Sequence, residues 1–277
     1  MAVTTIPQTP PIADAFQLDA LDRELAGTPF AGRVRYFASI DSTNTLAMRE
    51  AEEGQESGTV YLADEQTGGR GRGEHSWHSA PGSGLYVSIL LRPRLAPADI
   101  LWVSLAAGLA VQQAIREVTS LAVDLRWPND LLLSGRKLGG ILTELNAEVT
   151  RVRHAVIGVG LNVHQAAFPP ELALLATSLT IETGQEWSRQ DLLVALLRNV
   201  DREISRLTTE RLDAVTADIR ERLAAGSSWI KGKQVVVTES DTFAGITDGL
   251  DSRGFLRVRT GDGVRTVLSG GVREGGR

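Results

Sequence analysis

The stretch from residue 121 to residue 163 contains four apolar, strand-like segments in direct succession, at 121–127, 129–133, 138–146 and 153–163. Ser134 and Gly135 stand between the second and third segments and are typical of a hairpin turn. Strands joined by short turns pair antiparallel, whereas parallel pairing needs a long crossover, usually a helix. The stretch therefore predicts an antiparallel-rich α+β fold, a mixed sheet with packed helices, and not alternating β–α–β units.

Further strands and helices surround this stretch. Apolar periodicity predicts strands at 34–40, 59–64 and 84–92, and helices at 18–26, 45–53, 99–118, 189–207 and 209–224. The helix at 99–118 is long and apolar, so we expect it to pack on the sheet. Ser188-Arg-Gln-Asp191 resembles a capping box at a helix start, with aspartate in the usual glutamate place.

The chain divides into three parts. We expect residues 1–30 to be an N-terminal extension, partly disordered because Pro7, Pro10 and Pro11 stand among small polar residues. Gly226-Ser-Ser228 marks a second boundary. Beyond it, short strands are predicted at 233–238, 243–247, 254–259 and 264–268. We therefore expect a main domain at 31–226 and a small SH3-like β-barrel at 227–277.

Composition excludes several classes of site. The 277 residues are 42% hydrophobic and 23% charged, and the net charge of −5 argues against general nucleic-acid affinity. There is no cysteine, so disulfides and thiolate chemistry are excluded, and the four histidines show no HExxH pattern. No apolar run reaches about 18 residues and no signal peptide is evident, so we expect a cytoplasmic protein without membrane contact.

Lys137 is unusual because the chain supplies nearly all its positive charge as arginine. Of 29 basic residues, three are lysine, at positions 137, 231 and 233. Lys137 lies between two apolar runs in the segment Arg126-Trp-Pro-Asn-Asp-Leu-Leu-Leu-Ser-Gly-Arg-Lys-Leu-Gly-Gly-Ile-Leu142. An ammonium is a compact point charge that arginine does not replace. This segment alone fits a functional ammonium and a solvated turn lysine equally well.

A glycine-rich basic segment, Asp64-Glu-Gln-Thr-Gly-Gly-Arg-Gly-Arg-Gly73, follows an apolar run at 59–63. Its glycines alternate with Arg70 and Arg72. Successive backbone N–H groups in such a turn can bind an anion, and two guanidiniums add charge-assisted bonds. Composition alone favours a flexible basic loop or an RGG-like nucleic-acid segment. The spacing fits neither a dinucleotide fingerprint nor a P-loop.

Five segments taken together resemble the motifs of biotin protein ligases, in the order and at the spacing of that family. They cover roughly residues 34–165 and are Asp41-Ser-Thr-Asn44, Glu65-Gln-Thr-Gly-Gly-Arg-Gly-Arg72, Arg126-Trp-Pro-Asn-Asp130, Arg136-Lys-Leu-Gly-Gly-Ile141 and Ile157-Gly-Val-Gly-Leu-Asn162. The resemblance implies a class II synthetase-like catalytic domain in the form that lacks an N-terminal DNA-binding domain.

The same resemblance implies a two-step reaction. Biotin and ATP give biotinyl-5′-AMP and pyrophosphate, with Mg²⁺ expected on the phosphates. A lysine of a biotin carboxyl carrier protein, from acetyl-CoA carboxylase or another biotin-dependent carboxylase, then takes the biotinyl group. Two anions must meet in this reaction, so fixed positive charge is needed where the transition state develops. The resemblance therefore implies Lys137 and Arg72 as catalytic residues.

Binding roles are implied residue by residue. The biotin-side candidates are Ser42, Thr43, Gln66, Gly69, Arg70, Arg72, Lys137 and Gly140, and the ATP-side candidates are Arg70, Arg72, Trp77, Asn129 and Asn162. Each also has a structural interpretation. The Ser42-Thr43-Asn44 run suits a helix N-cap, and taken alone that interpretation is favoured. Gly140 suits a hairpin, the asparagines suit turns, and a tryptophan more often packs in a core or loop.

The chain departs from the family pattern at three places. Glu74 and His75 stand where a third basic residue is common, and Arg126 replaces a lysine. Near the C-terminus, 268–273 lacks the acidic residue often found in the last strand, so we assign no catalytic role to the tail. The metal ligands are not identified from the sequence.

Two other functions were weighed. A lipoate- or octanoate-type ligase of related fold would share several features, but the Arg-Trp-Pro-Asn-Asp and Gly-Arg-Gly-Arg motifs point to biotin. A biotin-responsive repressor is disfavoured because only 40 residues precede Asp41. We expect no specific nucleic acid as a partner, and a homodimer is left open.

Overall fold

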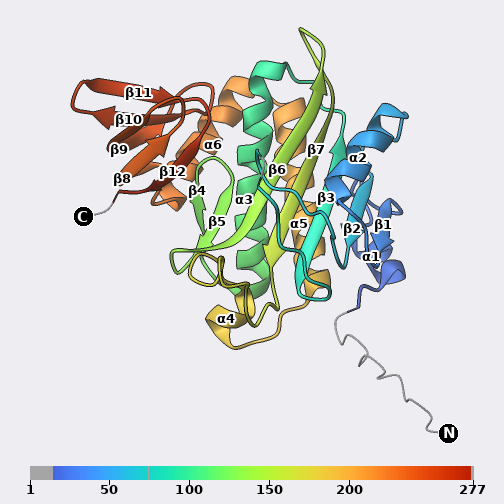
Figure 1. Cartoon of the computed structure of the whole chain (residues 1–277). Helices are drawn as coiled ribbons and strands as arrows, with labels where there is room; N and C mark the ends of the chain where they lie inside the picture. Colours follow the sequence, from blue (N-terminus) through green and yellow to red (C-terminus); the bar gives the residue numbers. More distant parts are fainter. Residues whose placement is uncertain (1–14, 74, 276–277) are drawn as a thin grey trace, which may run out of the picture.

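The computed structural model describes residues 15–73 and 75–275 (Figure 1). The larger of its two sheets has seven strands in the order β1-β2-β3-β7-β6-β5-β4. These strands are β1 (Val34–Phe37), β2 (Val60–Ala63), β3 (Gly84–Leu91), β4 (Asp124–Arg126), β5 (Asp130–Leu133), β6 (Arg136–Ala147) and β7 (Val152–Asn162). All neighbours pair antiparallel except β1 and β2, so the predicted antiparallel-rich α+β fold is confirmed.

The β5–β6 turn forms as the sequence predicts. Ser134 and Gly135 connect the two strands with positive φ angles of 51° and 77°. Glycine adopts such angles without steric cost, whereas serine does so rarely. The β6–β7 hairpin is the longest in the sheet and pairs Gly140 with Gly160 and Glu144 with Val156.

Helices cover both faces of this sheet. On one face α3 (Ile100–Thr119), preceded by the short η1 (Pro97–Asp99), packs against α5 (Arg189–Thr209). Leu85, Val87 and Ile89 of β3 point into the core below these helices. The opposite face carries α2 (Thr43–Glu52), which packs on the alternate residues of β3 and β7. Side chains alternate between faces along a strand, so each strand serves two cores.

Helix α3 is long and apolar enough to cross a membrane by length and composition. In the fold it packs on the sheet beside α5, with Trp102 and Leu105 fully covered. It is therefore a core helix, as the sequence predicts.

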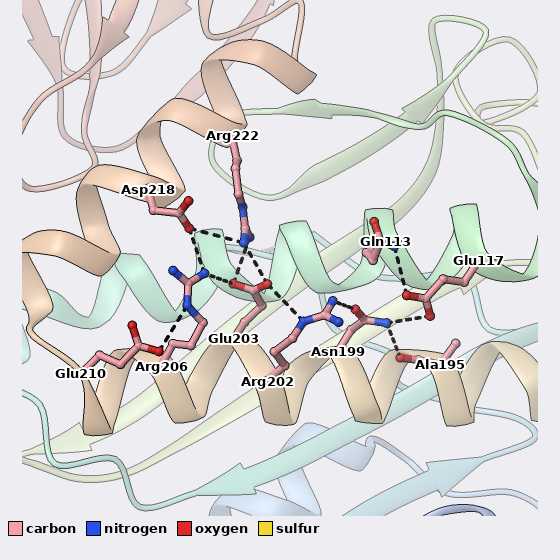
Figure 2. A network of polar contacts seen from close by, with 10 residues as sticks. All are labelled: Gln113, Glu117, Ala195, Asn199, Arg202, Glu203, Arg206, Glu210, Asp218 and Arg222. Atoms are coloured by element: carbon pink, nitrogen blue, oxygen red, sulfur yellow. Dashed lines mark hydrogen bonds and ion pairs between the residues drawn. The ribbon is translucent and has the colours of Figure 1, made fainter.

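A polar network joins α5 to its neighbours on the side away from the sheet (Figure 2). Glu203 of α5 is nearly buried and pairs with Arg222 of α6 (Leu212–Gly226) at 2.9 Å. Asn199 donates to Glu117 of α3 at 3.0 Å. Charges that are buried in this way stay favourable only while they are paired. The network therefore fixes α5 against α3 and α6.

The C-terminal part forms a separate five-stranded antiparallel sheet in the order β11-β10-β9-β8-β12. The strands are β8 (Lys231–Thr238), β9 (Thr242–Leu250), β10 (Leu256–Thr260), β11 (Gly263–Val267) and β12 (Gly271–Glu274). The sheet lies against the β4 edge of the larger one. Trp127 donates its indole N–H to the Gly254 carbonyl at 3.0 Å, and Ser227 donates to the Leu125 carbonyl at 2.6 Å. A small C-terminal β domain is thus confirmed.

Several details were not predicted. The helix expected at 45–53 is α2, which begins two residues earlier because Ser42 caps it and accepts from Thr45 N. The strand expected at 121–127 is limited to Asp124–Arg126. Helix α4 (Leu179–Thr183) and strand β12 were not expected. The disorder expected for residues 1–13 lies outside the described residues. Helix α1 (Leu18–Glu24) lies in the segment expected as an extension, yet Leu21 is buried in the main core.

Replacing Arg189 should destabilise the fold strongly. Its fully buried guanidinium donates to Asp64 at 2.8 Å and joins the start of α5 to the end of β2. Arg189→Met leaves a buried carboxylate unpaired, so we expect a loss of about 3–5 kcal/mol in the free energy of unfolding, measured by urea denaturation. Arg211→Met removes the exposed pair with Asp213 and should change nothing measurable. Equal losses in the two variants would contradict this account.

Candidate functional site

Two adjoining cavities lie beside the start of α2, on the sheet face opposite α3. The first is lined by Ser42, Thr43, Asn44, Gln66, Arg70, Gly71, Arg72, Trp77, Val87, Ser88, Asn129, Lys137, Gly140, Ile141, Leu142, Gly158, Val159 and Gly160. The second is wider and reaches the C-terminal sheet. They share Gly71, Arg72, Trp77, Asn129 and Lys137. Lys137 and Arg72 therefore stand at the junction of the two cavities.

The floor of the first cavity is bare backbone. A Cβ atom added to Gly160 would lie 2.4 Å from Cε2 of Trp77, and one added to Gly158 would lie 2.2 Å from Oδ1 of Asn44. Gly140 pairs with Gly160, and its Cβ would lie 3.3 Å from the same indole. Glycine permits this close approach of a side chain to the backbone. The Trp77 ring therefore rests on the Gly140–Gly160 pair.

The Trp77 indole N–H is buried and has no hydrogen-bond partner in the part of the chain that the structure describes. Buried donors are rarely left without a partner, and each such case calls for an explanation. Here the nitrogen faces the backbone of Gly160, where a Cβ atom would lie 2.5 Å away, so the ring's seat on the glycines leaves the donor without a partner among the described residues.

One end of the first cavity holds a cluster of hydroxyl and amide groups. The backbone N–H and the hydroxyl of Thr43 both donate to Gln66 Oε1 at 3.0 Å. The Ser88 hydroxyl lies 2.7 Å from the Thr43 hydroxyl and 2.5 Å from Asn44 Oδ1. Ser42 caps α2 and also lines the cavity, so its role as a cap does not remove it from the candidate site. The cluster suits a neutral ligand group that donates and accepts hydrogen bonds.

Lys137 near the start of β6 is held by a charge network. Its ammonium pairs with Asp130 at 2.6 Å and lies 5.5 Å from the centre of the Trp77 ring. The other Asp130 oxygen accepts from Arg126 at 2.5 Å. Burial raises the pKa of Asp130, but the Lys137 and Arg126 charges outweigh that effect and hold the pKa below its usual range. Asp130 is therefore a fixed anion that orients both cations.

The two arginines of the glycine-rich loop bond to protein groups on opposite sides. Arg70 pairs with Glu144 of β6 at 3.0 Å. Arg72 donates to the Gly270 carbonyl, in the C-terminal sheet, at 3.0 Å. The loop thus crosses the junction of the cavities with one guanidinium anchored in each domain.

The second cavity collects residues from distant parts of the chain. Its lining includes His75, His78, Arg126, Asp130, Asn162, Phe168, Leu172, Ala176 and the run from Gly270 to Arg273. Asn129 donates to the Ile141 carbonyl at 2.8 Å, and Asn162 donates to the Thr177 carbonyl at 2.9 Å. Both asparagines therefore fix backbone next to the cavity. The tail, to which the sequence led us to assign no catalytic role, forms part of the wall.

The structure brings together every predicted site residue except Gly69. That glycine packs inside the loop, where a Cβ would lie 2.5 Å from the Trp77 carbonyl oxygen. Sequence reasoning missed Asn44, Ser88, Asp130, Glu144 and the Gly158–Gly160 floor as site residues. The quoted motifs contained Asn44, Asp130 and both glycines, so the pattern held a signal for them. Ser88 and Glu144 lie outside those motifs.

Comparisons with known proteins identify both parts of the chain. The model described as "Biotin/lipoate A/B protein ligase family" matches residues 36–162, and "Biotin protein ligase C terminal domain" matches residues 231–272. The bifunctional ligase/repressor BirA of Bacillus subtilis is 34% identical over 87% of this chain and 73% of that protein. The biotin–(acetyl-CoA-carboxylase) ligase of Mycobacterium tuberculosis is 32% identical over 85% of this chain and 86% of that protein.

A solved structure agrees with these matches. Biotin protein ligase from Aquifex aeolicus, in complex with biotin and ATP, superposes with a TM-score of 0.75 at 29% identity. The superposition covers 88% of this chain and 99% of that one. The agreement therefore extends over both sheets.

Gly160→Ala should displace the Trp77 ring, because the methyl carbon would lie 2.4 Å from Cε2. We expect a change in tryptophan emission that disappears in a Trp77→Phe background. Gly261→Ala is the matched control, since a Cβ there meets no atom within 4 Å. An emission change that persists in the Trp77→Phe background would show that the ring does not lie on Gly160.

Proposed function

The chain belongs to the biotin protein ligase family, and from that premise we propose that it activates biotin with ATP to biotinyl-5′-AMP and transfers biotin to a lysine of a carrier protein. The observation that carries this proposal is the position of Lys137 at the junction of the two cavities. A carboxylate in one cavity and a phosphate in the other would meet beside a single ammonium.

We assign biotin to the first cavity. Its ureido ring would lie at the hydroxyl and amide cluster of Ser42, Thr43 and Gln66, and its apolar ring would lie between that cluster and the Trp77 ring that covers Gly140. Its carboxylate would then point toward Lys137. A lipoyl or octanoyl chain has no hydrogen-bonding group for that cluster and would leave it unsatisfied, which costs free energy. The cluster therefore favours biotin over the related acyl substrates.

We assign ATP to the second cavity. Its phosphates would lie near Lys137, Arg72 and Arg126, where positive charge collects, and its adenine would lie near Trp77. The asparagines Asn129 and Asn162 would shape this wall. In the first step a biotin carboxylate oxygen attacks the α-phosphorus and the bond to pyrophosphate breaks. Preorganised cations at this point stabilise the charge that develops in the transition state.

In the second step the neutral amine of the carrier lysine attacks the carbonyl carbon of the mixed anhydride. An amide forms, AMP leaves with the electron pair, and the amine proton passes to solvent. We propose a biotin carboxyl carrier protein of acetyl-CoA carboxylase, or of another biotin-dependent carboxylase, as this acceptor.

Mg²⁺ would reach the site bound to ATP. The described residues contain no group of three acidic or histidine side chains that could hold a metal ion. Asp130, which lines the second cavity, is already paired with Lys137 and Arg126. Phosphate oxygens and water would therefore supply most of the ligands, and the ion would neutralise part of the phosphate charge.

The direct test is biotin-dependent exchange of labelled pyrophosphate into ATP, because only a reversible adenylation supports it. Exchange with biotin, and none with lipoate or octanoate, is the expected result. Exchange that depends on lipoate or octanoate would identify the related ligase.

Lys137→Ala should abolish adenylate formation more severely than it weakens biotin binding. Removing one charge donor from a developing transition state costs about 10²–10³ in rate. The measurement is single-turnover formation of biotinyl-AMP at saturating biotin and ATP. Lys137→Arg should rescue poorly, because a guanidinium is larger and differently hydrated. The control is Lys231→Ala, which replaces an exposed lysine on β8. A similar rate in both alanine variants would show that Lys137 takes no part in the reaction.

Arg72→Gly should leave the synthesis of biotinyl-AMP largely intact while weakening its retention in the site. A charge-assisted hydrogen bond contributes about 1.5–3 kcal/mol, so release of biotinyl-AMP should accelerate about 10- to 100-fold while synthesis continues. The escaped anhydride would acylate lysines of a bystander such as serum albumin, detected by blotting for biotin. If the variant synthesises the adenylate but releases it no faster than wild type, Arg72 does not retain it.

A further inference from the structure

Glu144 lies midway along β6, beside the first cavity, and both of its carboxylate oxygens are bonded. One oxygen pairs with Arg70 Nη2 at 3.0 Å. The other accepts from Arg70 Nη1 at 3.3 Å and from Asn44 Nδ2 at 3.0 Å. This is a two-pronged arginine–carboxylate contact, the geometry in which such pairs are strongest. Glu144 thereby links the glycine-rich loop to helix α2.

Asn44 continues the connection into the cavity floor. It is 4% exposed, its amide oxygen lies on Gly158, and that oxygen accepts from the Ser88 hydroxyl. Ser88 in turn lies 2.7 Å from the Thr43 hydroxyl, and the Thr43 backbone N–H donates to Gln66 Oε1 at 3.0 Å. An unbroken set of hydrogen bonds therefore runs from the polar end of the first cavity to the loop arginine. A ligand bound at that end and the loop would therefore contact the same hydrogen-bond network.

An ordinary ion pair on the same hairpin provides the contrast. Glu148 pairs with Arg151 at 2.8 Å at the hairpin tip, with both side chains largely in solvent. Such pairs contribute little because water screens them. The Glu144 side chain is 23% exposed and holds a buried amide as well as a guanidinium. The two pairs therefore differ in burial and in what they connect.

We infer that Glu144 is a positioning residue that holds the 68–73 loop over the first cavity and couples the loop to the groups that would recognise the biotin ring. The inference rests on the proposed function. Glu144 does not line either cavity, so it acts through Arg70 and Asn44 and not on the substrate. With Arg72 anchored on Gly270, the Glu144–Arg70 pair gives the loop its second side-chain attachment. Without that attachment the loop should open more often and release the mixed anhydride sooner.

The experiment measures the release rate of biotinyl-AMP from five variants: Glu144→Gln, Arg70→Gln, their double variant, the charge-keeping Arg70→Lys, and Arg151→Gln as the control. Each single variant at the Glu144–Arg70 pair should release the intermediate roughly three- to tenfold faster, as loss of a half-buried ion pair allows. The double variant should be no faster than either single one, because both remove the same contact. Arg70→Lys keeps the charge and should stay closer to wild type than Arg70→Gln. Arg151→Gln should match wild type.

A second measurement needs no ligand. Trypsin should cleave after Arg72 faster in Glu144→Gln than in wild type or Arg151→Gln, because a detached loop is more accessible. Release rates that multiply in the double variant, or loop cleavage unchanged by Glu144→Gln, would overturn the inference. Arg70 also lines the first cavity, so if Glu144→Gln folds poorly it is the ligand-free cleavage after Arg72 in Arg70→Gln, and not its release rate, that keeps the test valid. If wild type makes no biotinyl-AMP, the proposed function fails, whereas the cleavage result still decides whether Glu144 holds the loop.

Discussion

The site depends on the close approach of side chains to bare backbone in the β6–β7 hairpin. Gly158 and Gly160 lie on the same face of β7, and a Cβ on either would overlap Asn44 or Trp77. Glycine in a strand interior weakens the strand, because it carries a larger conformational entropy and packs no side chain. The hairpin compensates with its length and its central place between β3 and β5. The β6–β7 hairpin, which is paired on both sides, can thus accommodate two glycines that would weaken a less well-paired strand.

Charge is organised around the same hairpin in a different way. Arg126 ends β4 and Lys137 lies near the start of β6, on either side of strand β5. A single carboxylate, Asp130 at the start of β5, holds both cations. A lone ammonium at a cavity junction would have many rotamers, and fixing it costs conformational entropy. Because that entropy is lost on folding, it is not lost again when a substrate binds. An ammonium held in place in advance is what makes electrostatic stabilisation of a transition state effective.

Local patterns predicted most of the fold, the motif resemblance supplied the candidate site residues, and tertiary pairing accounts for the rest. The hairpin at Ser134–Gly135 and the apolar helix at 99–118 follow from turn chemistry and periodicity. The site residues followed from the motif resemblance, and all but Gly69 line a cavity. Glu144 could not be found in this way, because its role depends on Arg70 lying 74 positions away in sequence. Strand β12 was missed for a similar reason: its short sequence gives no strand signal without β8 beside it.

The C-terminal domain holds one loop arginine of the site through its backbone. Arg72 donates to the carbonyl of Gly270, a residue with φ of 86° just before β12. A carbonyl oxygen is a neutral acceptor, so its hydrogen bond to a guanidinium is weaker than the bond that an anion would make with the same donor. A guanidinium resting on it can move to a phosphate or a carboxylate at little cost. The second domain therefore holds the loop arginine near the junction while leaving it free to exchange partners. This explains how the tail can belong to the site although residues 268–273 include no acidic side chain.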